Sequence, residues 1–154
     1  MHHPLQGSEQ PLFKQIVLDL SQGLQDTFAY ISDINSGAIV VYSLKNNISW
    51  SIESDEIKPE NNAWNIVEYQ PFYMRTGVYG LALVGDKLLS SRLGKELYSM
   101  KTQKKKSDEV AEIISWERDK PGFSGSLTST SNGELFIATL DSREILYFNT
   151  SEVI

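Results

Sequence analysis

The sequence predicts an all-β fold, a partial β-propeller of about three four-stranded antiparallel blades. Short strands with alternating apolar residues recur along the chain, and turns rich in Gly and Asn separate them. The recurrence comes at nearly equal, blade-sized intervals, which is typical of propellers. The third observation is a composition of 40% hydrophobic and 10% aromatic residues, which favours sheet in a folded protein.

The first blade is expected over residues 15–60, after a flexible lead-in at residues 1–14 that is polar and interrupted by prolines. Its first strand precedes a turn-rich break at residues 21–26. Asn35-Ser36-Gly37 then supplies residues that tolerate positive φ, so a hairpin is expected there. The strands expected in this blade are 16–20, 28–34, 38–44 and 48–52.

The second and third blades are expected over residues 70–104 and 120–150, after a loop over residues 55–74. Their expected strands are 78–84, 87–92, 96–100, 126–130, 134–140 and 144–148. Residues 107–114 have helix-like apolar spacing, so a short helix or an irregular connection is expected between these blades.

A blade-sized repeat appears when Phe28, Tyr79 and Phe136 are treated as equivalent positions, since by subtraction they lie 51 and 57 residues apart. A single β-sandwich remains the alternative fold, because strand count alone does not exclude it. Three blades cannot close a ring whose usual number is four to eight, so the chain is either truncated or assembles.

Charge and sulfur content exclude several classes of function. A formal net charge of −6 argues against general affinity for nucleic acid, and the basic run Lys101–Lys106 is expected to be a solvated loop. The chain has no cysteine, so it offers neither a disulfide nor a thiolate. No apolar run is long enough to span a membrane. The N-terminus lacks the pattern of a secretory signal, so a secreted protein would start elsewhere in its precursor.

Catalytic residues are not predicted. The two histidines, His2 and His3, fall in the lead-in, and Gly122-Phe123-Ser124-Gly125 does not have the spacing of a nucleophile elbow. Ser-His-Asp hydrolysis is therefore disfavoured.

Carboxylates at predicted strand ends and turns could line one mouth of a propeller and bind calcium, which takes oxygen ligands. Asp33 with Asn35 would supply two such ligands, but an Asp in this position more often caps its own turn. No metal and no cofactor are predicted. The carboxylates considered are Asp33, Asp55, Glu56, Asp86 and Asp141.

Several segments resemble the yellow and major royal jelly protein family of insects, in family order, from about Leu12 to Asn149. The most specific is the segment 25–50, which contains Gln-Asp-Thr-Phe-Ala-Tyr-Ile-Ser-Asp, Gly-Ala-Ile-Val-Val-Tyr-Ser-Leu and Asn-Ile-Ser-Trp. Gly77-Val-Tyr-Gly-Leu-Ala-Leu83 is similar to the family's Gly-x-x-Gly-x-Ala-Leu strand. Pro121-Gly-Phe-Ser-Gly-Ser126 and Asn132-Gly-Glu-Leu-Phe136 extend the likeness.

The resemblance implies part of a secreted six-bladed propeller, with a non-catalytic role in small-molecule binding or in cuticle pigmentation and development. The alternatives are dopachrome conversion, which some family members are thought to perform, and a calcium-dependent lactonase-like activity. The chain departs from the family in lacking its cysteines and in residues 85–93.

The resemblance also indicates ligand-binding positions, since relatives are understood to hold biogenic amines in the central channel. It places Thr128 and Arg143 in the pocket-forming segment, and Asp33 is the strand-end carboxylate added to them. The expected partner is a small aromatic or amine-type ligand, with neither nucleic acid nor membrane. Arg143 stands where the family commonly has Asn, and its charge would repel a protonated amine.

Two N-glycosylation sequons accord with secretion, at Asn47-Ile-Ser and Asn149-Thr-Ser. Asn47 falls in a turn that is expected to be exposed.

Overall fold

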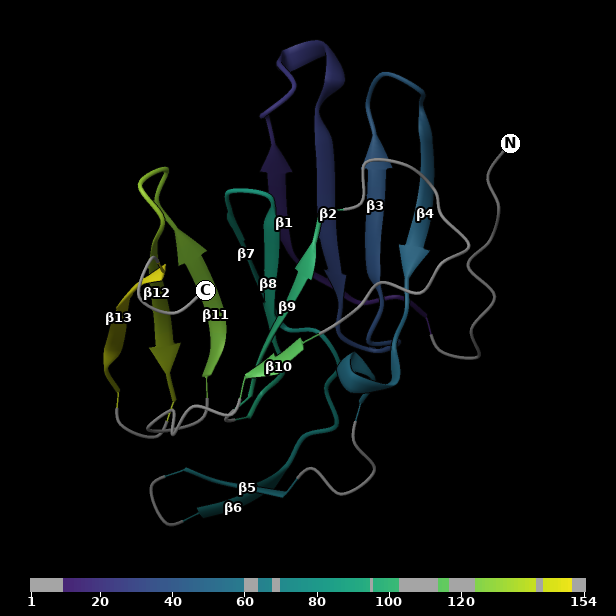
Figure 1. The fold of residues 1–154 in the computed structure, drawn as a ribbon. Helices are drawn as coiled ribbons and strands as arrows, with labels where there is room; N and C mark the ends of the chain where they lie inside the picture. Colours follow the sequence, from purple (N-terminus) through teal and green to yellow (C-terminus); the bar gives the residue numbers. More distant parts are fainter. Residues whose placement is uncertain are drawn as a thin grey trace.

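The computed structural model contains three antiparallel sheets and a separate two-stranded hairpin. It describes residues 10–59, 64–67, 70–94, 96–102, 114–116, 124–140 and 143–150. The all-β prediction is confirmed for these residues. Figure 1 shows the three sheets side by side, with the sheet that contains β7 between the other two.

The first sheet has the strand order β1-β2-β3-β4 and is a simple antiparallel meander. A 3-10 turn, η1 (Leu24–Asp26), lies between β1 and β2, and η2 (Asp55–Ile57) follows β4. The strands are β1 (Phe13–Asp19), β2 (Phe28–Asp33), β3 (Ile39–Ser43) and β4 (Ile48–Ile52).

The second and third sheets are also meanders, in which each strand pairs with the next along the chain. The second sheet contains β7 (Gly80–Val84), β8 (Lys87–Ser91), β9 (Leu97–Lys101) and β10 (Ile114–Trp116). The third sheet contains β11 (Ser124–Ser129), β12 (Glu134–Thr139) and β13 (Ile145–Asn149). Within the described residues the third sheet therefore has three strands, where four were expected.

Alternation along the strands gives the first and third sheets one apolar face each that is buried against the second sheet, which is itself buried on both faces. The first core cluster fills the space between the first and second sheets, which we call the first seam; Tyr30, Val41 and Leu88 are fully buried there. The second cluster fills the second seam, between the second and third sheets, around Leu89 and Leu135. Three stacked sheets replace the two-sheet sandwich considered as the alternative fold, and among the described residues they do not close a ring.

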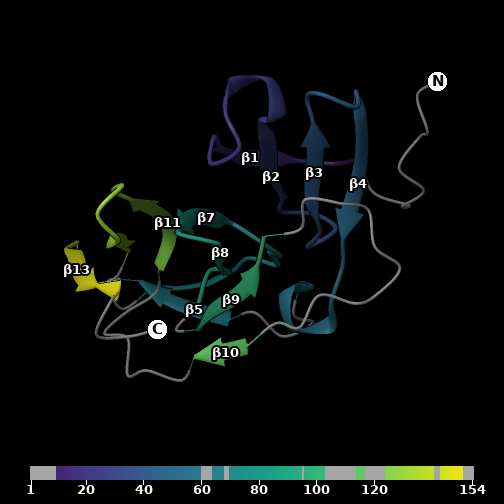
Figure 2. The ribbon, with the colours of Figure 1, turned by 45° about the horizontal axis from the view of Figure 1, so that its top comes forward.

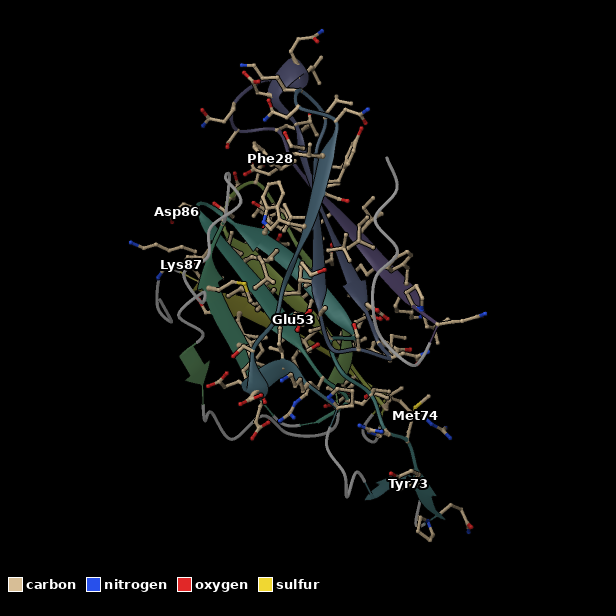
Figure 3. The ribbon with its side chains drawn as sticks, turned by 90° about the vertical axis from the view of Figure 1, so that its right-hand side faces the viewer. Phe28, Glu53, Tyr73, Met74, Asp86 and Lys87 are labelled. Carbon is tan, nitrogen blue, oxygen red and sulfur yellow. The ribbon has the colours of Figure 1, made fainter. Side chains whose placement is uncertain are left out.

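The chain between the first two sheets differs from the expected loop over residues 55–74. It contains the hairpin of β5 (Trp64–Val67) and β6 (Gln70–Tyr73). Figure 3 shows Tyr73 and Met74, at the end of this hairpin, apart from the three stacked sheets. The hairpin was missed because Pro59 and Pro71 indicated a loop, although Pro is accepted on an edge strand.

The equivalence assumed for Phe28, Tyr79 and Phe136 is wrong. Phe28 and Phe136 lie on second strands, β2 and β12, whereas Tyr79 precedes the first strand of its sheet. The first strands begin at Phe13, Gly80 and Ser124, which by subtraction are 67 and 44 residues apart. The inserted hairpin makes the first interval longer, so the spacing is not uniform.

Two smaller expectations also need correction. The first strand begins at Phe13, inside the segment expected to be a flexible lead-in. Ile114, expected to end a helix, begins strand β10, and the rest of that segment, residues 107–113, lies outside the described residues. The blade boundaries at residues 60, 70, 104, 120 and 150 remain predictions.

Candidate functional site at the junction of the inner strands

The first strands of the three sheets, β1, β7 and β11, meet along one line, and the Gln15 side chain connects all three. Its Nε2 donates to the carbonyl oxygens of Leu81 on β7 at 2.6 Å and of Leu127 on β11 at 2.9 Å. Its Oε1 accepts from the Leu81 amide at 3.1 Å. Both polar ends of one amide group are thus satisfied by the inner edges of two other sheets. We call this meeting of strands the inner junction.

Local irregularities direct the inner strands toward this line. The register of β1 against β2 shifts between Phe13 and Ile16, and that of β11 against β12 shifts between Ser124 and Leu127. A β-bulge of this kind adds an unpaired residue and re-aims the side chains beside it. Gln15 lies within the irregular part of β1, between Phe13 and Ile16. Its side chain therefore faces β7 and β11 rather than the neighbouring strand of its own sheet.

The backbone of Gln15 is also held, by a serine that is fully buried. The Ser32 hydroxyl accepts a hydrogen bond from the Gln15 amide at 3.0 Å. The same hydroxyl lies 3.3 Å from the Tyr79 carbonyl oxygen, to which it can donate. Ser32 therefore connects β2 of the first sheet to the residue before β7.

The three inner strands run in the same direction. Gln15 meets Leu81, while Lys14, one residue earlier, has its Nζ 5.1 Å from the centre of the Tyr79 ring, before β7. Gly80 lies against Gly125, and Leu83 accepts from the Ser129 hydroxyl at 2.6 Å. Figure 2 shows β7 and β11 side by side. Because the strands are co-directional, their starting ends form one rim of the junction.

Two glycines allow the second sheet to approach both of its neighbours. A Cβ on Gly77 would collide with the Cα of Gly37 in the β2–β3 turn, and a Cβ on Gly80 would collide with the carbonyl oxygen of Gly125 on β11. Gly77 also donates its amide to the Ile34 carbonyl at 2.7 Å. Each glycine of the Gly-x-x-Gly segment thus serves a different seam.

Asp33, the first of the predicted ligand-binding residues, is 3% exposed at the end of β2. Its Oδ1 accepts from the amides of Leu12 and Asn35, at 2.9 and 3.1 Å, and its Oδ2 accepts from the Ser36 hydroxyl at 2.7 Å. This set of contacts describes a carboxylate that caps its own turn and anchors the chain before β1. A ligand role for Asp33 stays a prediction.

Thr128 and Arg143 lie in the third sheet. Thr128 is exposed on β11, one residue after Leu127, whose carbonyl binds Gln15. Arg143 is exposed with φ 55° in the turn between β12 and β13. Ser124, the first residue of β11, pairs with Thr139, the last residue of β12, so this turn lies at the starting end of β11. The turn after Asp33 lies at the starting end of β1 in the same way, because Asp33 pairs with Phe13. The roles predicted for these two residues stay predictions.

The residues that make the junction, above all Gln15, Ser32 and Tyr79, were not predicted from the sequence. Gln15 had no sequence signal, because a single glutamine in a polar segment is uninformative. Tyr79 lies between the two glycines of a segment that was noted only as a family marker. Glycines in a strand segment often mark a place where another backbone approaches closely, and this signal could have pointed to Tyr79.

The carboxylates considered as calcium ligands are not gathered together where they are described. Asp33 caps its turn, and Asp55 forms an exposed ion pair with Lys58 at 2.7 Å. The hydrogen bond and charge of that lysine lower the pKa of Asp55. Asp86 is exposed in the β7–β8 turn, and Asp141 lies outside the described residues. Within the described ranges, no group of three or more His, Asp or Glu side chains is placed to hold a metal ion.

A second polar cluster closes the outer part of the first seam. The Arg92 guanidinium contacts the Glu96 carboxylate and the Tyr98 hydroxyl, and its Nη1 donates to the Lys58 carbonyl at 3.1 Å. Tyr98 donates to Glu96. Burial, followed by this hydrogen bond, raises the pKa of the Tyr98 hydroxyl above its usual value. The cluster ties the segment after η2 to the second sheet, which is a structural role.

The two sequons differ in accessibility. Asn47 is exposed in the β3–β4 turn with φ 48°, and its Oδ1 accepts from the Tyr42 hydroxyl at 3.0 Å. Asn149 is half-buried at the end of β13, where it pairs with Glu134. The described segments contain no helix that is long and apolar enough to cross a membrane.

The protein is an all-β protein whose antiparallel meanders of three or four strands stack face to face and meet at their first strands, an arrangement consistent with an open set of propeller blades. The model of the family described as major royal jelly protein matches residues 3–154. The chain therefore belongs to the major royal jelly protein family, as its sequence segments indicated.

Curated relatives are yellow-related salivary proteins of sand flies. The chain is 35% identical over 72 residues to protein SP04 of Phlebotomus argentipes, a match that covers 46% of the chain and 18% of the relative. It is 25% identical over 136 residues to protein M35 of Phlebotomus duboscqi, which covers 81% of the chain and 34% of the relative. The chain thus spans at most about a third of these relatives.

Among solved structures, U3-55K aligns over 92% of the chain and 53% of its own length, with 12% identity and a TM-score of 0.32. A score of this size carries no argument about fold or function.

Proposed function

We propose that the chain belongs to a secreted, non-catalytic binding protein that takes a small aromatic molecule at the inner junction. The observation that supports this most is the Tyr79 ring beside the junction, with the Lys14 ammonium 5.1 Å from its centre. The ring would supply apolar contact to an aromatic ligand, and the ammonium over the ring would supply a positive charge. The polar groups at the junction would set the orientation of the ligand.

The charges at this end favour a neutral or acidic aromatic ligand over a protonated amine. Lys14 is exposed on β1, and Arg143 is exposed in a turn at the same end of the third sheet. The carboxylate of Asp33 accepts three hydrogen bonds from its own turn and the preceding chain. The positive charge of Lys14 would repel an ammonium group on a ligand and attract a carboxylate, since the Asp33 carboxylate is already engaged in this way.

A pair of ligands with the same ring and opposite charges tests this proposal by titration calorimetry. Indole-3-acetate should bind more tightly than tryptamine. Lys14→Gln should weaken indole-3-acetate about twofold to fivefold, the effect of losing roughly 0.5–1 kcal/mol. Lys45→Gln is the matched control, because Lys45 pairs with Asp26 at the other end of the first sheet.

Tighter binding of tryptamine, or an equal effect of both lysine variants, would contradict the proposed site. Incubation of the same protein with dopachrome tests its non-catalytic character. An enzyme-dependent loss of dopachrome absorbance would replace binding with turnover as the function.

Secretion predicts glycosylation at Asn47, whose turn is open to an oligosaccharyltransferase. When the protein is expressed in insect cells behind a heterologous signal peptide, peptide-N-glycosidase should lower its apparent mass. Asn47→Gln should abolish that shift, while Asn149→Gln, at a half-buried strand end, should preserve most of it. A shift that survives Asn47→Gln and disappears with Asn149→Gln would show that the assignment is reversed.

A further inference from the structure

The turn between β11 and β12 contains the only Asn-Gly pair in the sequence, Asn132 and Gly133. The Asn132 side chain is exposed, and within the described part of the chain it makes no hydrogen bond. Gly133 has φ 81°, a conformation that favours glycine. Asparagine is a thermolabile residue, and a free asparagine followed by a residue without a Cβ is the arrangement most open to attack by the backbone.

The reaction open to this pair needs water and no other reactant. The Gly133 backbone nitrogen gives its proton to water and attacks the Asn132 Cγ, which closes a succinimide ring. The bond between Cγ and Nδ2 breaks, and the departing nitrogen takes up a proton and leaves as ammonia. Water then opens the ring at either carbonyl, so the product is aspartate or isoaspartate. No electron is transferred, and the product gains a negative charge.

Hydrogen bonds hold this turn closed from two sides. Gly133 donates its amide to the Thr130 carbonyl at 3.1 Å, so the attacking nitrogen is engaged in the closed turn. The Gly133 carbonyl accepts from the Thr150 amide at 3.0 Å and from the Thr150 hydroxyl. At the base of the turn, Thr130 donates its amide to the Glu134 carbonyl and its hydroxyl to the Glu134 carboxylate, both at 2.9 Å. The attack therefore requires the turn to open first.

We propose that Asn132 is a modification site, and that opening of this turn sets the rate at which it converts to aspartate or isoaspartate. When opening and closing are fast, the rate of such a reaction follows the population of the open form. Asn47 is also exposed in a turn, but Ile48 follows it, and the branched side chain of Ile48 hinders attack by its own amide. The proposal depends on the β11–β12 turn and not on the proposed ligand.

Conversion of Asn132 changes the contacts at this end of the third sheet. The new carboxylate stands two residues before the Glu134 carboxylate, and the two like charges repel. In isoaspartate the main chain is also longer by a methylene group, which shifts the Gly133 carbonyl away from Thr150. Thr150 is 5% exposed directly after β13, so its buried amide and hydroxyl lose their acceptor. The end of β13 should therefore loosen.

Peptide mapping by mass spectrometry measures the conversion at each asparagine of the purified chain, after incubation in mildly alkaline buffer. We expect Asn132 to gain the mass difference between an amide and a carboxylic acid. Part of the product should be isoaspartate, which an isoaspartyl methyltransferase labels with methyl groups. Asn47 should stay unmodified in the same molecules. Asn132→Gln should abolish both signals, because attack on the longer side chain would close a larger and less favoured ring.

Removal of one hydroxyl from the closed turn tests whether opening sets the rate. Thr150→Val should speed the conversion about fivefold, the effect of losing one hydrogen bond from the closed form. Thr27→Val is the matched control, because it removes a bond of the same kind in the first sheet, from the Thr27 hydroxyl to the Leu24 carbonyl at 2.8 Å. The unmodified protein should convert much faster in concentrated guanidinium chloride than in buffer, a comparison that does not depend on the folding of a variant.

Hydrogen exchange measures the structural consequence. The Thr150 amide should exchange faster after conversion, while the Leu44 amide, which donates to the Thr27 carbonyl at 3.0 Å in the first sheet, should keep its protection. Unchanged exchange at Thr150 would contradict the predicted loosening of β13.

Equal rates of conversion in buffer and in denaturant, or equal rates in Thr150→Val and Thr27→Val, would overturn the control by turn opening. An Asn132 that stays intact in the folded protein and in Thr150→Val, while it converts in denaturant, would overturn the site itself.

Discussion

The two seams of this protein join similar sheets by different means. The first seam is aromatic: Phe28 and Trp50 form an edge-to-face pair at 6.4 Å, and Tyr30 and Tyr98 are buried beside them. The second seam is mainly aliphatic, and hydroxyl groups connect its two sheets. Ser91 on β8 donates to the Gly125 carbonyl at 2.7 Å, and Ser129 on β11 donates to the Leu83 carbonyl at 2.6 Å.

This difference shows where each seam is sensitive. The first depends on the volume of large side chains, which can adjust slightly when a neighbour changes. The second depends on how closely the backbones of β7 and β11 approach, since Gly80 and Gly125 lie directly against one another. A Cβ added at Gly80 should therefore disturb the second seam strongly, whereas a change in tyrosine ionisation should act on the first seam, where Tyr30 and Tyr98 are buried.

The largest expected effect is that of Gly80→Ala in the second seam. The added Cβ would collide with the backbone oxygen of Gly125, which cannot rotate away. We expect the free energy of unfolding to fall by about 3 kcal/mol, the upper part of the range for overpacking. Urea denaturation measures this, with Gly94→Ala as the control, because the space around Gly94 is open. Equal stability of the two variants would show that the strands do not approach as described.

The next effect is that of Gln15→Ala, which removes the side chain that connects β1, β7 and β11 at the inner junction. Three backbone groups, on Leu81 and Leu127, lose the partner that Gln15 provides. An unsatisfied polar group costs about 1–3 kcal/mol, and water can reach part of this site, so we expect a loss of about 2 kcal/mol. Gln22→Ala, at an exposed turn, is the matched control. A loss no greater than that of the control would remove Gln15 from the junction.

The third effect depends on pH and acts on the first seam. Burial raises the pKa of Tyr30, and the charge of Asp19 adds to this effect; burial and Glu96 raise the pKa of Tyr98. The folded protein therefore keeps protons that the unfolded chain releases above its usual tyrosine pKa of 10.0. Stability should be fully retained below pH 10 and should fall as the pH rises further, by about 1.4 kcal/mol per pH unit for each tyrosine.

Denaturation of Tyr98→Phe between neutral and high pH checks this expectation. Above pH 10 the free energy of unfolding should fall less steeply with pH in the variant, by about 1.4 kcal/mol per pH unit, because one tyrosine no longer contributes. This change in slope is expected whatever the substitution does to stability at neutral pH. Tyr73→Phe, at a ring that is half exposed, should leave the slope unchanged. Parallel curves for the unmodified protein and Tyr98→Phe would contradict a buried, proton-retaining hydroxyl.

Much of the fold could be predicted from the sequence because local rules agree with it. Phe28 to Asp33 and Ile48 to Ile52 form strands where alternation indicated them, and positive φ at Gly37 and Gly85 marks the expected turns. The β5–β6 hairpin and β10 could not be predicted in this way. A strand interrupted by Pro, and one of three residues, carry too little periodicity to be recognised.

The candidate site could be predicted only in part. Thr128 and Arg143 were noted through the family resemblance, and Asp33 through its place at a strand end. Gln15 and Tyr79 depend on how three sheets meet, and contacts between residues 66 and 112 positions apart leave no local pattern. Gly77 and Gly80 are exceptions, because a glycine at each position indicates from the sequence that another backbone comes close there.

The most direct test of the inner junction is residue-resolved hydrogen exchange at the Leu81 amide. This N–H points toward β1 and donates to the Gln15 Oε1. We predict that the Leu81 amide is protected in the unmodified protein and exchanges much faster in Gln15→Ala, while the amide of Ala82 keeps its protection through β8. Rapid exchange at Leu81 in the unmodified protein, or protection that survives Gln15→Ala, would contradict a junction held by this side chain.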